Sequence, residues 1–350
     1  MRSIIQVILL TTLLLAPASA AGVPAIQADI TYAWAYQTGD YVRGQPAVNE
    51  GLVYVGSDDN ALHAVDSQTS KEAWHYDTGD NVTSQPALLG DLLYFGSWDG
   101  TVYALVATTG QVRWQHATGG WITGSPVVAD NVVYAGSYDG YLYALRADTG
   151  DPVWRYRTGG RIEAGPTAAG DSLFIGASDG YLYALDRTSG VLRWRFRANG
   201  GIVTTPAAAG GVVYVGSLGG RFYALDAATG REVWTFDAPA AFESSPATAD
   251  GVIYVGADDG RLYALAARDG HLQWQYQAGG LVRSSPATWG SFVFVGSDDG
   301  FVYGLQRDSG ALAWRYRTGG AIVAGPTVTD GWLYVSSTDR QLHAFTLVGG

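Results

Sequence analysis

The sequence predicts an all-β protein, an eight-bladed β-propeller whose blades are four-stranded antiparallel sheets. The chain repeats itself every 40 residues without an insertion or deletion, and each repeat contains four short runs with the composition of strands. No stretch of the repeats shows the 3.6-residue periodicity of an amphipathic helix. The period is marked by one tryptophan per repeat, which we expect to lie in the core between blades: Trp34, Trp74, Trp114, Trp154, Trp194, Trp234, Trp274 and Trp314.

Residues 202–234 show how one repeat forms its strands. The run 203–208 contains Pro206, whose missing N–H is tolerated at a sheet edge, so we expect an edge strand there. The runs VVYV and RFYALD that follow are rich in β-branched and aromatic residues and are expected to form the central pair. After a turn at residues 228–230, the alternating run EVWTFD is expected to form the last strand.

The central strands and the two chain ends together predict a closed ring. Residues 52–55 and 252–255 are apolar on consecutive positions, so both faces of each sheet need cover, which neighbouring blades supply. Residues 30–36 form the first tryptophan-bearing run, but the three strands that precede this run in the other repeats are missing before it. The last repeat has those three strands and ends without a tryptophan-bearing run. We therefore expect the N-terminal strand to complete the eighth blade, which removes exposed sheet edges.

The first 20 residues have the pattern of a cleaved secretory signal: a positive charge at Arg2, an apolar run, and a small-residue site that predicts cleavage after Ala20. We expect residues 21–29 to form a short linker and residues 30–350 a single propeller. The protein is then exported, periplasmic or extracellular, and soluble. No other run approaches the roughly 20 apolar residues that cross a bilayer, so we expect no direct membrane insertion.

The net charge argues against one class of partner, and the cysteine content argues against disulfides. The net charge is −11, and removal of Arg2 gives −11 − 1 = −12 for the mature chain. A field of this sign repels phosphate backbones, so we expect no nucleic-acid partner. The chain has no cysteine, and a closed core of eight blades is large enough to do without disulfides. We expect the propeller to be monomeric.

One repeat carries a recognisable motif in full: Ala224, Asp226, Thr229, Gly230 and Trp234. This pattern resembles the tryptophan-docking motif of the pyrroloquinoline-quinone (PQQ)-like repeat propellers, and the resemblance covers the chain from residue 30 to the C-terminus. Other copies drift, as where Ser70 replaces the glycine or Ser189 the threonine.

The resemblance implies one of two kinds of protein. Quinoprotein dehydrogenases of the family bind PQQ and Ca²⁺ and stack the cofactor against a vicinal disulfide, whereas this chain has no cysteine and no insertions that could build a substrate pocket. Scaffold propellers of the BamB type hold partner proteins in outer-membrane assembly and do no chemistry. They are lipoproteins, and the anchoring cysteine is missing here. We therefore expect no cofactor, with PQQ and calcium only under the alternative.

Two columns of the repeat vary most and lie on the same face of the predicted ring: the loops between blades and the turns between the second and third strands. Bulky aromatic residues gather in these columns in the second and third repeats, followed by an arginine in the fourth. Such clusters anchor protein interfaces, unless Trp98 and Tyr138 only cap their own blades. The candidate partner-binding residues are Tyr41, Trp98, Trp121, Tyr138 and Arg161.

A third column places charges near the mouth of the central channel: Arg43, Glu163, Glu243 and Arg283. Two carboxylates raise the possibility of a glycosidase, but inner strands ~10 Å apart around a ring separate the two backbones by roughly 18 Å. A catalytic pair needs about 5–9.5 Å. We expect solvated charges that Arg43 and Arg283 balance.

The aspartates that recur in the turns, such as Asp99 and Asp139, indicate turns rather than a calcium site, because one carboxylate per blade cannot gather six to eight ligands. The histidines are scattered, so we expect no metal site.

Together these features favour an exported, non-catalytic scaffold with an envelope protein as partner. Enzymatic activity remains open, and the alternatives are a PQQ-binding quinoprotein or a propeller that binds sugars on Trp98, Trp121 and Tyr138.

Overall fold

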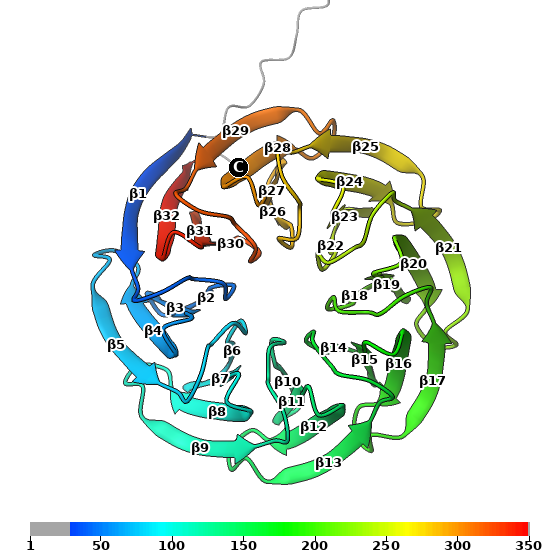
Figure 1. Ribbon diagram of the computed structural model, residues 1–350, viewed down its shortest axis with the longest axis horizontal. Helices are drawn as coiled ribbons and strands as arrows, with labels where there is room; N and C mark the ends of the chain where they lie inside the picture. The colour runs from blue at the N-terminus through cyan, green and yellow to red at the C-terminus, as the bar shows by residue number, and fades with distance from the viewer. Residues whose placement is uncertain (1–28, 349–350) are drawn as a thin grey trace, which may run out of the picture.

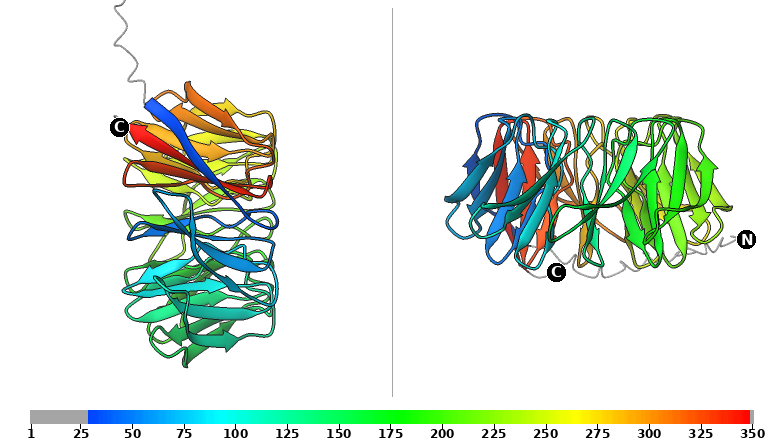
Figure 2. Two further views of the ribbon diagram at one scale, coloured as in Figure 1. Left: turned by 90° about the vertical axis from the view of Figure 1, so that its left-hand side faces the viewer. Right: turned by 90° about the horizontal axis from the view of Figure 1, so that it is seen from below.

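The computed structural model describes residues 29–348, which form 32 strands in eight four-stranded antiparallel sheets. The sheets stand radially around a central axis, with the first strand of each innermost (Figure 1), and together make a flat disc (Figure 2). The expected eight-bladed propeller is confirmed. The described residues include no helix that could cross a membrane. The predicted signal (1–20) and nearly all of the predicted linker (21–29) lie outside them.

The blades are numbered I to VIII in chain order. Blades I to IV contain, from the axis outward, β2 (Ala47–Asn49), β3 (Leu52–Gly56), β4 (Ala61–Asp66) and β5 (Glu72–Asp77); β6 (Ala87–Leu89), β7 (Leu92–Gly96), β8 (Thr101–Val106) and β9 (Val112–Ala117); β10 (Val127–Ala129), β11 (Val132–Gly136), β12 (Tyr141–Arg146) and β13 (Pro152–Arg157); β14 (Thr167–Ala169), β15 (Ser172–Gly176), β16 (Tyr181–Asp186) and β17 (Leu192–Arg197).

Blades V to VIII continue in the same order. They contain β18 (Ala207–Ala209), β19 (Val212–Gly216), β20 (Arg221–Asp226) and β21 (Glu232–Asp237); β22 (Ala247–Ala249), β23 (Val252–Gly256), β24 (Arg261–Ala266) and β25 (Leu272–Gln277); β26 (Ala287–Trp289), β27 (Phe292–Gly296), β28 (Phe301–Gln306) and β29 (Leu312–Arg317); β30 (Thr327–Thr329), β31 (Trp332–Ser337), β32 (Gln341–Val348) and β1 (Asp29–Gln37).

Blade VIII joins the two ends of the chain. β1 pairs antiparallel with β32, with Ile30 opposite Leu347 and Tyr36 opposite Leu342. In Figure 1 the blue β1 lies outside the red β32. The N-terminal strand therefore closes the ring, as expected.

The innermost strands are shorter than expected. The strand predicted over 203–208 covers only Ala207–Ala209. Pro206 cannot donate a hydrogen bond, and the N–H of Ile202 donates to the carbonyl of Ala177 in the turn of the preceding blade at 3.0 Å. The residues before the proline thus connect blades instead of extending the sheet.

The core lies between blades, as the apolar central strands predicted. There are eight hydrophobic clusters among the described residues, one at each blade interface. At the interface of blades III and IV, for example, Tyr134 and Leu142 pack with Ile162, Leu173 and Ile175, all buried. This burial is the main driving force for closing the ring.

The repeated tryptophans link each blade to the next. Trp154 Nε1 donates to the carbonyl of Arg187 at 3.2 Å, and seven of the eight make the same bond to a carbonyl 33 residues further along. Trp314 makes no such bond within residues 29–348; its ring lies edge-on to Phe294. Trp114, Trp234 and Trp274 are buried and the other five are partly exposed, because all lie on outer strands.

The recurring aspartates hold the turns. Asp139 Oδ2 accepts from the N–H of Gly119 at 2.8 Å and from the hydroxyl of Tyr143 at 2.6 Å, while Oδ1 accepts from the N–H of Tyr141 at 2.9 Å. Gly140 completes the turn with a φ of 81°, a conformation that favours glycine. Six of the seven such aspartates tie the loop entering their blade to their own turn in this way; the exception is Asp259, which faces Pro239.

Candidate functional site

The two variable columns lie side by side on one face of the disc. The N–H of Asp58 donates to the carbonyl of Tyr41 at 2.8 Å, and the N–H of Tyr138 donates to the carbonyl of Trp121 at 2.9 Å. We call this side, formed by the loops between blades and by the turns between the second and third strands, the loop face.

Three aromatic rings pack against one another on the loop face over blades II and III. The ring centroids of Trp98 and Trp121 are 5.0 Å apart with planes 15° from parallel, and those of Trp121 and Tyr138 are 5.4 Å apart. A guanidinium closes each end: that of Arg43 lies 5.7 Å from the Trp98 centroid, and that of Arg161 lies 5.2 Å from the Tyr138 centroid. We call these five residues the aromatic stack.

Polar contacts fix the aromatic stack in place. Trp98 Nε1 donates to Thr83 Oγ1 at 2.9 Å, and the hydroxyl of Tyr138 donates to Glu163 Oε2 at 3.0 Å. Arg161 forms an ion pair with the same glutamate at 3.2 Å. Burial and the charge of Glu163 raise the pKa of Tyr138, which therefore stays a neutral hydrogen-bond donor. Because the rings are held before any partner arrives, little side-chain entropy would be lost on binding.

The structure brings most of the sequence candidates together. Trp98, Trp121, Tyr138 and Arg161 form one cluster, in which Trp121 is 46% exposed. Tyr41 is 44% exposed but stacks on no ring among residues 29–348. Arg43, which the sequence placed at the channel mouth, belongs to the cluster through its contact with Trp98.

The charges at the channel mouth are paired differently from the expectation. Arg43 forms an ion pair with Asp58 of its own blade, and Glu163 with Arg161, so Arg43 does not balance the two glutamates. Comparison of equivalent positions in the repeats could not predict the pair of Arg43 and Asp58. Asp58 lies in the turn between the second and third strands, whereas Arg43 lies in the column at the channel mouth. The expected balance does hold for Arg283 and Glu243, whose charged atoms are 3.4 Å apart.

Arg283 holds three carboxylates at once. Its guanidinium lies 3.4 Å from Glu243, 3.1 Å from Asp258 and 3.7 Å from Asp298. Burial, and next the charge of Asp258, raise the pKa of Glu243 despite Arg283. Burial likewise raises the pKa of Asp298.

Of these carboxyls, that of Glu243 borders a cavity of about 320 Å³ on the axis, lined by residues from seven blades that include Arg43 and Arg283. A carboxyl with a raised pKa can act as a general acid. However, no hydroxyl or imidazole of the described residues forms a hydrogen bond with Glu243, so no nucleophile and base stand together there.

The cavity does not suit PQQ and Ca²⁺. PQQ is a polycarboxylate that needs free cations, but Arg43 and Arg283 are already occupied by carboxylates of the protein. Among residues 29–348 no three acidic or histidine side chains gather so that they could hold a metal ion. The residues present therefore do not fit this group.

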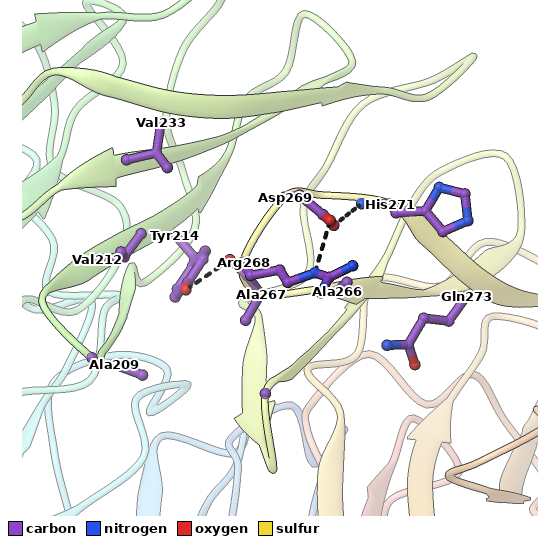
Figure 3. A pocket seen from close by; sticks show the side chains of 12 residues that line it. Ala209, Val212, Tyr214, Val233, Ala266, Ala267, Arg268, Asp269, His271 and Gln273 are labelled. Carbon is purple, nitrogen blue, oxygen red and sulfur yellow. Dashed lines mark hydrogen bonds and ion pairs between the residues drawn. The ribbon is translucent and has the colours of Figure 1, made fainter.

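A cavity of about 700 Å³ lies between blades V and VI (Figure 3). The turns that line it, at residues 209–212 and 266–271, belong to the side opposite the loop face. At the equivalent positions of blades III and IV Arg187 pairs with Asp130, and Arg307 pairs with Asp250 between blades VI and VII. Between blades V and VI these positions hold Ala267 and Gly210, so this ion pair is missing there. Ala147 with Gly90 and Ala227 with Gly170 are the same combination at two other interfaces. Sequence analysis missed the groove, because the change from arginine and aspartate to alanine and glycine does not single out one interface.

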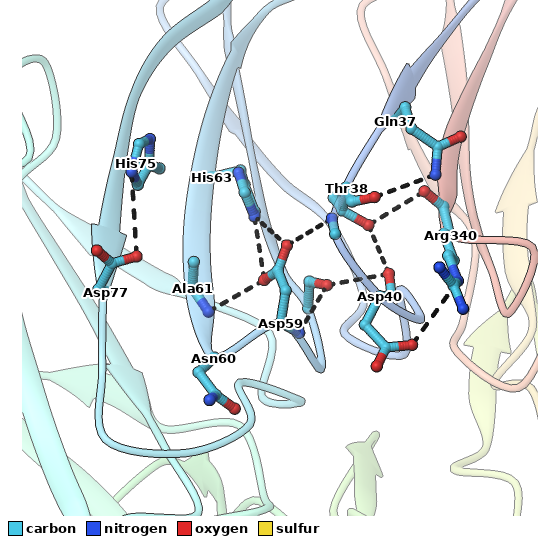
Figure 4. A network of polar contacts seen from close by, with 12 residues as sticks. Gln37, Thr38, Asp40, Asp59, Asn60, Ala61, His63, His75, Asp77 and Arg340 are labelled. Atoms are coloured by element: carbon cyan, nitrogen blue, oxygen red, sulfur yellow. Dashed lines mark hydrogen bonds and ion pairs between the residues drawn. The ribbon is translucent and has the colours of Figure 1, made fainter.

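A polar network lies where blade VIII meets blade I (Figure 4). His63 stands where most repeats have tyrosine, and its Nε2 lies 3.1 Å from Asp59 Oδ2, which also accepts from the N–H of Gly39 at 2.8 Å. On the other side of the imidazole, Glu72 contacts His63 Nδ1 at 3.2 Å, His75 Nδ1 at 2.8 Å and the hydroxyl of Tyr36. These contacts satisfy the histidines within the protein.

The ring of eight blades, linked by repeated tryptophans, defines a PQQ-like repeat β-propeller. The family model described as outer membrane protein assembly factor BamB matches residues 25–196, 178–289 and 278–350. The chain belongs to this family, which confirms the resemblance inferred from its repeats.

Solved structures show the same fold. BamB from Moraxella catarrhalis is 24% identical, with a TM-score of 0.80 over 91% of this chain and 99% of that one. The computationally designed Ika8 protein is 16% identical, with a TM-score of 0.80 over 89% and 97% of the two chains. The quinohemoprotein alcohol dehydrogenase from Comamonas testosteroni is 18% identical, with a TM-score of 0.77 over 91% and 76%. No curated protein sequence matches the chain.

Proposed function

We propose that this chain is an exported, non-catalytic scaffold that holds a partner protein in the cell envelope during outer-membrane protein assembly. The family description and the similarity to BamB support the setting. The aromatic stack carries the proposal, because half-exposed tryptophan and tyrosine flanked by arginine are the residues that most often anchor protein interfaces.

The geometry of the stack favours a protein partner over a sugar. A sugar ring packs on a free aromatic face, but Trp121 already has Trp98 at 5.0 Å and Tyr138 at 5.4 Å between ring centroids. The guanidinium of Arg43 lies 5.7 Å from the Trp98 centroid. These contacts leave less free ring face for a sugar, whereas apolar side chains and carbonyl groups of a partner loop can also use the exposed ring edges.

The experiment is crosslinking in intact cells followed by affinity capture and mass spectrometry. Wild type is compared with Trp98→Ala/Trp121→Ala and with Trp289→Ala, a partly buried aromatic at the opposite side of the disc that serves as matched control. We expect the double variant to lose an envelope protein that wild type and control both recover, and to lower the level of assembled outer-membrane proteins. Equal recovery by all three proteins, with unchanged melting curves, would remove the stack from the proposal.

A further inference from the structure

Blades III and IV carry two arginines each on their outer strands. The guanidinium groups of Arg155 and Arg157 on β13 lie 4.7 and 5.7 Å from the ring centroid of Tyr141. On β17, Arg195 and Arg197 lie 4.9 and 5.6 Å from the ring of Tyr181. All four side chains are exposed at the rim. We call Arg155, Arg157, Arg195 and Arg197 the rim strip.

The rim strip carries positive charge that the protein does not neutralise. Two other arginines of blade IV are paired: Arg187 with Asp130, and Arg193 with Asp186 at 2.7 Å. None of the four rim arginines forms an ion pair within the part of the chain that the structure describes, although the protein has 32 acidic residues and a net charge of −11. Four neighbouring cations without partners are therefore available to an external anion.

The aromatic support and the arginine pair occur together along the chain. Blade VII also has such a pair, Arg315 and Arg317, at 5.0 and 5.6 Å from Phe301. The five blades without the pair have no aromatic residue at this position but Ala61, Thr101, Arg221, Arg261 and Gln341. A guanidinium held against a ring keeps its N–H donors in plane and pointing outward, the arrangement that binds a carboxylate with two hydrogen bonds.

Protection of the sheet edge does not account for the rim strip. Charged side chains on edge strands discourage pairing with other chains. The outer strands of five blades do without the double arginine, so the edge can be protected in other ways. Only blades III and IV place two such pairs on adjacent blades.

We propose that the rim strip binds an acidic segment of the partner protein; this rests on the proposed function. Residues two apart on one strand are about 6.8 Å apart, the spacing of carboxylates on alternate residues of an extended peptide. The strip is also close to the aromatic stack along the chain, since β13 ends at Arg157, four residues before Arg161. A short acidic segment meets only the strip, whereas an anionic membrane is an extended surface that a chain of net charge −11 would tend to repel.

The test measures binding of a fluorescein-labelled deca-glutamate peptide by fluorescence anisotropy, with deca-glutamine as neutral control. The proteins are wild type, the variant Arg155→Gln/Arg157→Gln/Arg195→Gln/Arg197→Gln, and the matched control Arg315→Gln/Arg317→Gln, which removes the same motif from the single blade VII. We expect the fourfold variant to bind at least tenfold more weakly and the control to stay within twofold of wild type. Wild-type affinity should fall steeply as salt rises.

Three outcomes would overturn the proposal: no binding of deca-glutamate to wild type, equal binding by the fourfold variant, or arginine-dependent binding of phosphatidylglycerol vesicles without peptide binding, which would assign the strip to a membrane. The variant Trp98→Ala/Trp121→Ala separates the two proposals. Because it leaves the strip intact, its peptide affinity should match wild type even where partner capture is lost. If Trp98→Ala/Trp121→Ala loses partner capture but the fourfold arginine variant still binds the peptide like wild type, the scaffold proposal stands and the proposal of an acidic partner segment is wrong.

Discussion

Asn199 Nδ2 donates to the carbonyl of Gly219 at 3.0 Å, and this contact replaces the aspartate that holds the same turn in the other seven blades. Asn199 Oδ1 accepts from Ser217 Oγ at 2.6 Å, and its N–H donates to the hydroxyl of Tyr223 at 2.9 Å. A Cβ atom on Gly219 would lie 2.5 Å from Asn199 Cγ. The polar side chain has moved from the turn to the loop that faces it.

This exchange predicts a rescue. Asn199→Gly should lower the free energy of unfolding by about 0.5–1.5 kcal/mol, because the side-chain hydrogen bonds with Gly219 and with the buried Ser217 are lost. Gly219→Asp alone should also destabilise through its clash with Asn199. The double variant recreates the pair seen at Gly119 and Asp139 and should recover most of the loss. Denaturant titrations in a double-mutant cycle measure the coupling; additive losses would contradict the interpretation.

Gly230 lies against a repeated tryptophan, and Gly210 offers a control. Both have positive φ, 70° and 59°, but a Cβ on Gly230 would lie 2.6 Å from Trp194 Cδ2, whereas one on Gly210 would meet nothing within 4 Å. Alanine should cost about 1–2 kcal/mol at Gly210 from backbone strain and about 1–3 kcal/mol more at Gly230 from overpacking. Urea unfolding measures the loss of unfolding free energy in each alanine variant. Equal losses would show that Trp194 shifts away from the new Cβ at no energetic cost.

Glu72 should make stability depend on pH. Partial burial would raise its pKa, but hydrogen bonds from Tyr36, His75 and His63 outweigh this and lower the pKa to about 2. The carboxylate therefore stabilises the fold above its ordinary pKa of 4.5, and this contribution is lost as the pH falls toward 2. The hydrogen bond to Glu72 raises the pKa of His75, whose contribution is complete below 6.5 and is lost as the pH rises through the raised value.

The variant Glu72→Gln tests this assignment. The difference in unfolding free energy between wild type and variant should be largest between about pH 4.5 and 6.5 and should shrink on either side. Asp77 and Asp59 face the same network and remain in both proteins, so their titration cancels in the comparison. A difference that does not change between pH 2.5 and 6 would contradict the role of Glu72.

The open groove between blades V and VI predicts that the missing ion pair can be rebuilt. Gly210→Asp with Ala267→Arg should rebuild the ion pair of Asp250 and Arg307, and Asp250 shows that aspartate accepts this backbone with a φ of 48°. A partly exposed pair contributes about 0.2–1 kcal/mol. The double variant should melt higher than either single variant. A double variant that melts below the single variants would contradict the prediction and would mean that the surrounding residues keep the two new side chains apart.

The axial cavity predicts that PQQ does not stabilise this protein. Its two arginines are already bound to carboxylates, so adding PQQ with Ca²⁺ should leave the melting temperature where Ca²⁺ alone leaves it. A rise of several degrees, or a quinone absorption band that persists after dialysis, would favour the quinoprotein alternative.

Much of the fold could be predicted because its signals are local and repeated. Tyr214 and Tyr223 lie in runs whose composition already specifies central strands, and the unmatched ends predicted the pairing of β1 with β32. The short innermost strands could not be predicted, since the hydrogen bond from Ile202 to Ala177 joins two blades. For the candidate site, the columns found Trp98 and Trp121, but the partners of Arg43 depended on side-chain direction.

The sequence by itself determined the number of blades, the order of their strands and the closure of the ring, because period, strand composition and chain ends are properties of the linear chain. Only the tertiary structure decided that Arg43 lies against Trp98, that Asn199 holds the turn of Gly219, and that the rim arginines form no ion pair within residues 29–348. Such relationships depend on side chains from different loops or blades. Their distances follow from how the sheets pack around the axis, which no single repeat encodes.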